Sequence, residues 1–171
     1  MMAAFERWLV AANRWLLILM LAAMACMVFA NVVLRYMTNE SLVWAEEVSR
    51  HMMIWITFLG AGLVLRFGGH IAIEDLHDRL PGVAGRLLRT LIVVLLMAFF
   101  ATMAWHGVHY LEATQYQTTP VTGVSFAWVY SALPIGFVLL MIHLALVARR
   151  YIVTRKYLAS SEMNADAAAS I

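Results

Sequence analysis

The residues best suited to chemistry by type are Glu46, Glu47 and Arg50, which stand at the head of a long apolar run. Charged side chains so close to hydrocarbon are costly and need partners, so their presence marks a functional or assembly site. Glu46 and Arg50 are four residues apart with the acid first, the better orientation for an ion pair along one helix. Arg35 ends the preceding apolar run, so a helical hairpin would bring it to a similar depth.

Two interpretations of this charge cluster are open. It is either a solvated helix start among lipid headgroups or a paired group buried against another helix or subunit. The charge-free stretch 51–65 gives about 22 Å of helix, less than a hydrocarbon core of about 30 Å, so the charges lie at or just inside the membrane boundary. An unpaired charge there costs up to about 2.5–3.5 kcal/mol, which favours pairing, with Glu47 and Arg35 left to bind each other or another subunit.

Three histidines raise an alternative function. His51, His106 and His109 are expected at similar depth on two helices, where two of them could ligate haem in the membrane anchor of a redox complex. Interfacial polar residues are the commoner role of such side chains, and the sequence favours that role, so no cofactor is predicted. The sequence also contains no glycine-rich phosphate loop, no metal motif and no serine–histidine–acid set in a recognisable context, so we do not expect an enzyme.

The composition predicts an all-α membrane protein. Of the 171 residues, 64% are hydrophobic and 13% are charged, and the mean hydropathy is +0.81. A soluble domain would be nearer half apolar and a quarter charged. The apolar runs predict one domain over residues 1–158 with four transmembrane helices, at about 15–35, 42–66, 88–111 and 126–148.

The positions of the basic residues predict an orientation. Ten of the twelve Lys and Arg residues fall on the side of the two termini and the second connection, and only Arg35 and Arg50 fall on the side of the first and third connections. Cytoplasmic segments carry the excess of Lys and Arg, so both termini of this multi-pass membrane protein are expected in the cytoplasm.

Three shorter segments complete the sequence-based prediction. Residues 70–80 alternate apolar and charged positions in a way that suits a short amphipathic helix lying in the interface, between the second and third spans. Pro134 is expected to kink the fourth span, because its ring removes a backbone hydrogen bond. Residues 159–171 are small and polar, which predicts a disordered cytoplasmic tail.

An ordered set of residues resembles the DctQ-like small membrane subunit of TRAP (tripartite ATP-independent periplasmic) transporters. The set spans nearly the whole chain and follows the same four-helix plan. It comprises 31–36 (NVVLRY), 44–47 (WAEE), Arg50, 58–61 (FLGA), Arg66, 70–71, 79–81, 119–120, Gly123, Trp128, Tyr130, 133–134 and Gly136.

This resemblance implies a function, partners and a location in the bacterial inner membrane. It implies a sodium-coupled importer of a small carboxylate, such as a dicarboxylate, keto acid or sugar acid. The small subunit would be a scaffold for the large membrane subunit, would help to dock a periplasmic substrate-binding protein, and would contact membrane lipid but no nucleic acid. Its site residues are then assembly residues, expected here to be Arg35, Trp44, Glu46, Glu47, Arg50 and His70.

The predicted orientation can be tested by labelling single cysteines from outside intact cells. We expect a Gln117→Cys probe to be modified and an Ala84→Cys probe to be protected, because these positions lie in connections on opposite sides of the membrane. The reverse pattern would invert the topology.

Overall fold

The structure is a computed structural model that describes residues 2–66 and 82–154. Its elements are helices: α1 (Met2–Thr38), α2 (Val43–Arg66), α4 (Gly82–Thr114), the short α5 (Phe126–Tyr130) and α6 (Ala132–Thr154). Four segments are long and apolar enough to cross a membrane, with α5 and α6 together forming the last. The prediction of an all-α protein with four membrane-spanning helices is therefore confirmed.

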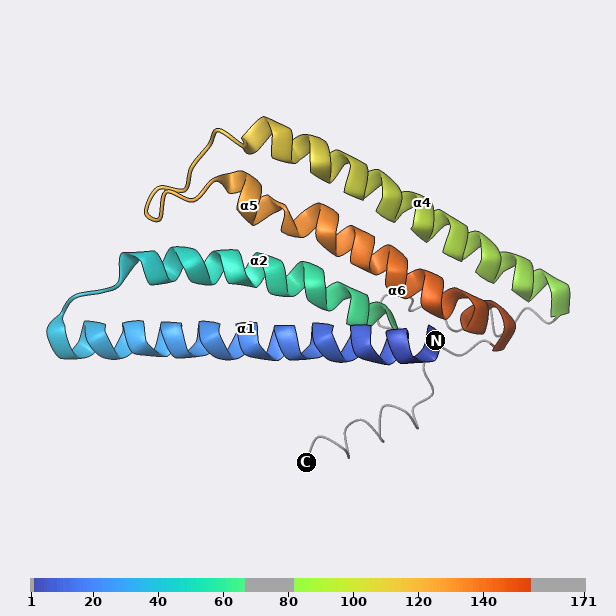
Figure 1. Cartoon of the computed structure of the whole chain (residues 1–171), viewed down its shortest axis with the longest axis horizontal. Helices are drawn as coiled ribbons and strands as arrows, with labels where there is room; N and C mark the ends of the chain where they lie inside the picture. The colour runs from blue at the N-terminus through green and yellow to red at the C-terminus, as the bar shows by residue number, and fades with distance from the viewer. Residues whose placement is uncertain (1, 67–81, 155–171) are drawn as a thin grey trace, which may run out of the picture.

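The helices form an open layer rather than a closed bundle. Figure 1 shows them side by side in the order α1, α2, α6, α4, so that helices adjacent in space are not all adjacent in sequence. The α1–α2 turn and the α4–α5 loop lie at one end of the layer, which we call the loop end. The N-terminus, the start of α4 and the end of α6 lie at the other, the terminal end.

Helix α1 is longer than the sequence analysis proposed. The expected span at 15–35 is part of one unbroken helix of 37 residues, Met2–Thr38, which is about 55 Å long at the standard rise. The reason is local, because no Gly or Pro occurs before Gly60 to interrupt it. The helix ends at Thr38, and the following Asn39 has a left-handed φ of 59°, which asparagine tolerates after a helix.

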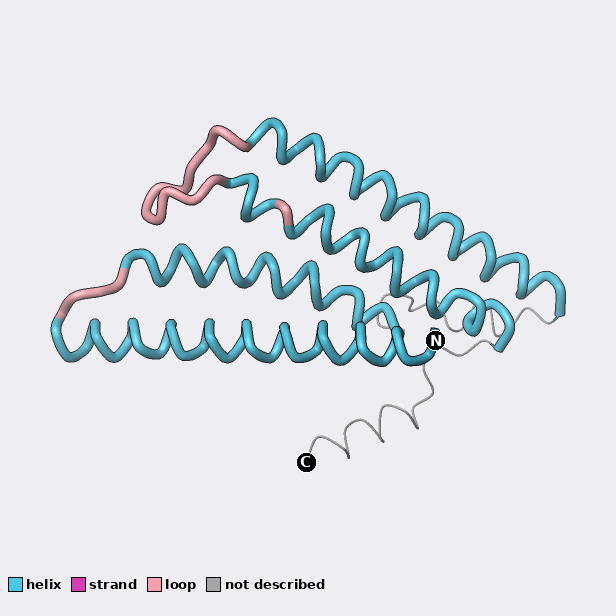
Figure 2. Tube along the Cα trace, in the orientation of Figure 1, coloured by secondary structure: helices cyan, strands magenta, loops and turns pink. Residues whose placement is uncertain are grey.

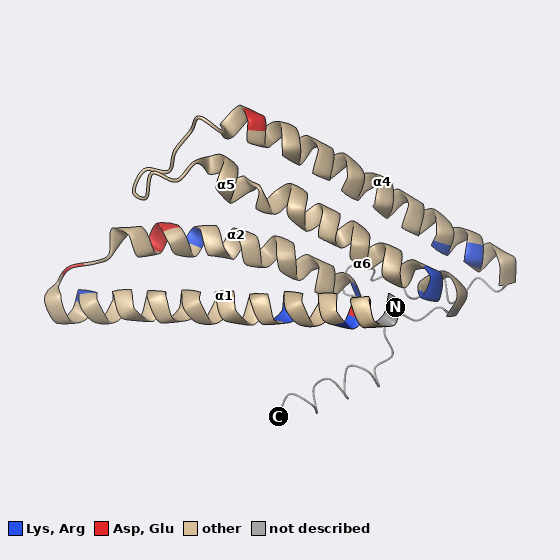
Figure 3. Ribbon diagram, viewed as in Figure 1, with Lys and Arg blue, Asp and Glu red and all other residues tan. Residues whose placement is uncertain are grey.

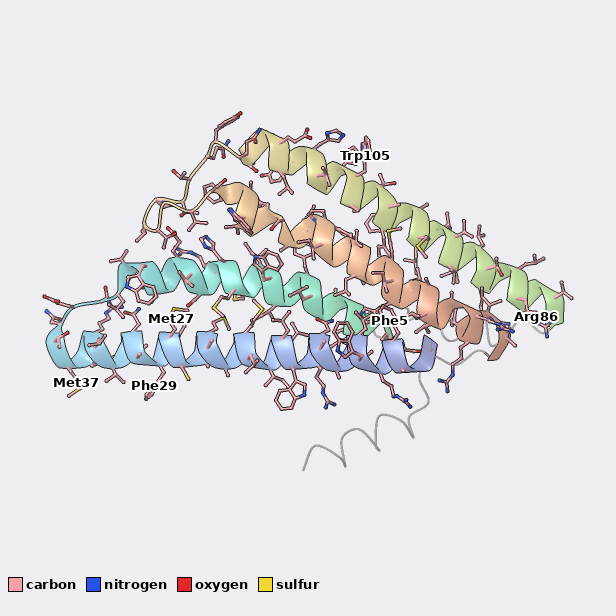
Figure 4. The ribbon with its side chains drawn as sticks, viewed as in Figure 1. Phe5, Met27, Phe29, Met37, Arg86 and Trp105 are labelled. Carbon is pink, nitrogen blue, oxygen red and sulfur yellow. The ribbon has the colours of Figure 1, made fainter. Side chains whose placement is uncertain are left out.

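Contact between α1 and α2 runs along one line of α1 at alternating spacings of three and four residues, as in left-handed helix packing. Two asparagines on this line form hydrogen bonds with backbone groups of α2 and of the turn before it. The Asn13 side-chain amide donates to the Leu59 carbonyl at 3.0 Å, and the Asn31 side-chain oxygen accepts from the Leu42 amide at 2.6 Å. In Figure 4, Met27 on this line lies between the helices while Phe29 points away. The line comprises Glu6, Val10, Asn13, Leu17, Met20, Met24, Met27 and Asn31.

Small residues bring α6 close to its two neighbours. A Cβ at Gly136 would lie 2.6 Å from the Cβ of Phe58 on α2, and one at Gly107 of α4 would lie 3.1 Å from the Pro134 ring. Such approach is the usual basis of helix association where lipid removes the hydrophobic driving force. Aromatic side chains fill the same region, since the Phe137 ring lies 5.9 Å from that of Phe58.

The last span is interrupted where the sequence predicted a kink. Pro134 cannot donate a hydrogen bond to the carbonyl of Tyr130, and the helix breaks at Ser131 between α5 and α6, as Figure 2 shows. The predicted interfacial helix at 70–80 and the predicted tail at 159–171 lie outside the described residues.

Glycine substitutions test this packing. We expect Gly136→Ala to lower the free energy of unfolding in detergent by about 1–3 kcal/mol, because the new methyl group meets the Phe58 backbone. In Gly60→Ala the methyl group would lie 3.8 Å from Leu17, an ordinary contact, so this control should be neutral or slightly stabilised by helix propensity. Equal thermal midpoints for the two variants would contradict the α2–α6 packing.

Candidate functional site

Glu47 is the buried member of the predicted charge cluster. It lies near the start of α2 with 3% of its surface exposed, and its carboxylate faces the α4–α5 loop. The amides of Val121 and Thr122 each donate to it at 3.0 Å, one to each carboxylate oxygen, and the Thr122 hydroxyl also donates. Two backbone amides and a hydroxyl around a carboxylate form an anion-binding arrangement, here filled by the protein's own side chain.

The loop that binds Glu47 is itself held by hydrogen bonds. The Thr119 amide donates to the Val124 carbonyl at 2.8 Å, and the Gly123 amide donates to the Thr119 carbonyl at 3.1 Å. The hydroxyls of Thr119 and Thr122 lie 2.8 Å apart, and Gly123 has the positive φ, 65°, that such a tight turn needs. Ser125 then caps α5 by accepting from the Ala127 amide. The loop is therefore a defined turn attached to α2.

The other cluster residues face outward. Glu46, Arg50 and Arg35 are exposed, and Trp44 is about half exposed. Within the described residues no ion pair joins Glu46 to Arg50 or Glu47 to Arg35, so neither predicted pairing forms within this chain. Figure 3 shows these charges gathered near the loop end of α1 and α2. The sixth predicted assembly residue, His70, lies outside the described residues.

A second polar group, which the sequence analysis did not assign, occupies the terminal end. Arg66 at the end of α2 forms an ion pair with Glu6 of α1, and only 3% of its surface is exposed. His143 of α6 is fully buried beside Gly62, where an added Cβ would lie 2.5 Å from its ring. Arg89 of α4 donates to the Ile152 carbonyl at 3.0 Å. These contacts fasten helix ends to their neighbours.

The structure does not support the haem alternative. His51 is on α2 and His106 and His109 are on α4, and α6 lies between these two helices. His106 and His109 are exposed, and His109 lies 3.4 Å from Glu112 on its own helix. Among residues 2–66 and 82–154, no three His, Cys, Asp or Glu side chains are grouped so as to hold a metal ion.

The loop end exposes a polar and aromatic surface beside the Glu47 contact. Tyr116 is 89% exposed and Trp128 is 74% exposed, and the side chains of Val121 and Val124 are partly exposed next to them. Large exposed aromatic side chains are enriched where proteins bind one another, so this surface suits a protein partner.

Glu47 should control the order of the loop. In Glu47→Ala the amides of Val121 and Thr122 lose charge-assisted hydrogen bonds worth about 1.5–3 kcal/mol each, so we expect their hydrogen exchange to accelerate roughly 10- to 150-fold. Glu46→Ala, one residue away and exposed, is the matched control and should leave exchange unchanged. Equal exchange in the two variants would show that Glu47 does not hold the loop.

Comparison with known proteins places this architecture in a family. The model of the DctQ component of tripartite ATP-independent periplasmic transporters matches residues 24–154. The ectoine TRAP transporter small permease protein TeaB of Halomonas elongata is 33% identical over 144 residues, which cover 81% of this chain and 73% of that protein.

More distant relatives carry the same kind of name. The C4-dicarboxylate TRAP transporter small permease protein DctQ of Vibrio cholerae is 26% identical over 152 residues, covering 75% of this chain and 66% of that protein. The isethionate TRAP transporter permease protein DctMQ of Oleidesulfovibrio alaskensis is 27% identical over 104 residues, covering 60% of this chain and 16% of that protein. The resemblance seen in the sequence is thus confirmed, and the chain belongs to the DctQ family of small permease subunits of TRAP transporters.

Proposed function

We propose that this chain is the small permease subunit of a sodium-coupled TRAP transporter that imports a small carboxylate, such as a dicarboxylate, keto acid or sugar acid. It acts as a scaffold for the large permease subunit and helps to dock a periplasmic substrate-binding protein. The observation that carries the docking role is the α4–α5 loop, a defined turn that is held by Glu47 and bears the exposed Tyr116, with the exposed Trp128 following it on α5.

The charge distribution supports the scaffold role. The acidic residues of the described spans lie near helix ends: Glu6 and Arg66 pair at the terminal end, and Glu46, Glu47 and Glu112 lie toward the loop end. An ion pathway would place ionisable groups along the middle of the spans. His143 lies near the middle of α6, where it is fully buried and packs on Gly62. Transport of substrate and sodium is therefore assigned to the large subunit.

Substrate choice is assigned to the partner subunits. Relatives are named for ectoine, C4-dicarboxylate, isethionate and sialic acid transport, so related chains serve different substrates. The match to the permease protein DctMQ covers 16% of that longer chain, which supports a small subunit working beside a much larger permease part.

The proposed orientation puts the loop end in the periplasm and both termini in the cytoplasm. The Lys and Arg distribution supports it, and it turns the loop and the α1–α2 turn toward a periplasmic partner. Arg35 and Trp44, exposed at this end, are proposed as contacts with the large subunit. The assembly role of His70 stays a prediction.

Reconstitution in liposomes with an inward sodium gradient tests the proposed function. The complete transporter should take up substrate, whereas this chain alone should not. Tyr116→Ala should raise the concentration of binding protein needed for half-maximal uptake, because it removes the most exposed aromatic side chain of the loop. Val83→Ala, 72% exposed at the terminal end, is the matched control.

Two outcomes would contradict the proposal. Uptake by the lone chain would end the scaffold assignment. An equal effect of Tyr116→Ala and Val83→Ala on the requirement for binding protein would move docking away from the α4–α5 loop.

A further inference from the structure

Helix α2 carries three lines of residues at alternating three- and four-residue spacing, and this chain uses two of them. Along one line, Leu59 and Arg66 bind α1. Along a second, Phe58 packs on Gly136 of α6 and Leu65 enters the core. The third line is exposed at five of its six positions, and we call these five the α2 stripe: Glu46, Arg50, Met53, Thr57 and Val64. The sixth position, Gly60, is half-buried and faces Leu17 of α1.

The spacing of the α2 stripe is one that this chain elsewhere uses for packing helices together. The line of α4 that lies against α5 and α6 has the same repeat and is buried at Arg89, Val93, Phe100 and Gly107. A line with a repeat of three and four residues stays on one face of a helix as a partner crosses it at a shallow angle. The α2 stripe therefore has the residue spacing of a helix-packing surface, but no helix of the described part of this chain packs on it.

Charges at one end of the α2 stripe favour a protein partner over lipid. Glu46 and Arg50 have opposite charges, and neither forms an ion pair within the described part of the chain. Both side chains lie near the membrane boundary, where a protein helix can hold a counter-charge at a fixed position beside each of them. Farther along, the Thr57 hydroxyl donates to the Met53 carbonyl at 2.8 Å, so this small residue needs no outside partner and permits close approach.

The other face of the layer has the opposite character. A groove of about 340 Å³ between α1, α2 and α6 has an almost entirely apolar lining that includes Trp8, Leu16, Leu59, Val138 and Ile142. Apolar side chains with this shape suit lipid tails.

We infer that the α2 stripe is the surface on which a membrane helix of the large permease subunit packs, with Glu46 and Arg50 paired to opposite charges of that subunit. The groove face is then turned to lipid. This inference rests on the proposed function, since it takes the large subunit as the partner. The inference goes further than the proposed function, because it states which face of the layer contacts the large subunit and which face contacts lipid.

Matched tryptophan substitutions test the inference with the two subunits co-expressed. Thr57→Trp places a bulky ring on the α2 stripe, and Val138→Trp places the same ring on the groove face. Both positions are exposed in the isolated chain, so both variants should insert and fold like the natural chain. Recovery of the large subunit with the tagged small subunit should fall several-fold for Thr57→Trp and stay unchanged for Val138→Trp.

Photocrosslinking identifies the occupant directly. In a Cys26→Ala background, benzophenone maleimide is attached to Met53→Cys or to Ile142→Cys. We expect Met53→Cys to crosslink to the large subunit and Ile142→Cys to give no protein crosslink. A Met53→Cys crosslink to a second copy of this chain, or to phospholipid alone, would overturn the inference, as would crosslinking of the large subunit through Ile142→Cys.

Recovery of the large subunit with the unsubstituted chain distinguishes failure of this inference from failure of the proposed function. If the large subunit is recovered with the natural chain but not crosslinked through Met53→Cys, the α2 stripe is wrong and the proposed function stands. If the natural chain recovers no large subunit, the proposed function fails, and the inference fails with it.

Discussion

These helices have to associate without the hydrophobic effect, because lipid tails are as apolar as the side chains they would replace. The contacts that remain are close packing and satisfied polar groups, and the structure uses both. Gly136 and Gly107 let α6 approach α2 and α4, while Asn13 and Asn31 bind α1 to backbone groups of α2. The result is a layer in which each helix touches its neighbours and leaves two faces open.

The need to satisfy buried polar groups also explains why the Glu47 carboxylate is bound by backbone amides of the α4–α5 loop and not by an arginine side chain. A carboxylate buried to 3% exposure needs several donors, and two adjacent backbone amides with a hydroxyl supply them at fixed positions. A long arginine side chain would lose more conformational entropy to do the same. The arrangement ties the α4–α5 loop to a helix that is remote in sequence, so the loop-end surface is set by the packing of α2.

An open layer suits a subunit that supports another one. A closed bundle would bury most of its polar contacts internally, whereas this layer keeps Glu46 and Arg50 exposed beside an otherwise apolar helix surface. At the terminal end, by contrast, Arg66 pairs with Glu6 and Arg89 donates to the Ile152 carbonyl, so both side chains make contacts within the chain. The two ends of the layer therefore differ in these charged side chains, which make contacts within the chain at the terminal end and are exposed at the loop end.

The number of membrane-spanning helices, their positions along the chain and the interruption before Pro134 could be predicted from the sequence. The apolar length of each span is a local property, and so is the backbone hydrogen bond that proline cannot donate. The family resemblance also followed from residue order. The partner of Glu47 could not be predicted, since Val121 and Thr122 are more than seventy residues away and backbone donors leave no mark in residue type. Nor could the sequence alone decide which of two adjacent acids, Glu46 or Glu47, would be buried. That choice depends on where α6 and the α4–α5 loop lie around α2, which is a property of the tertiary structure.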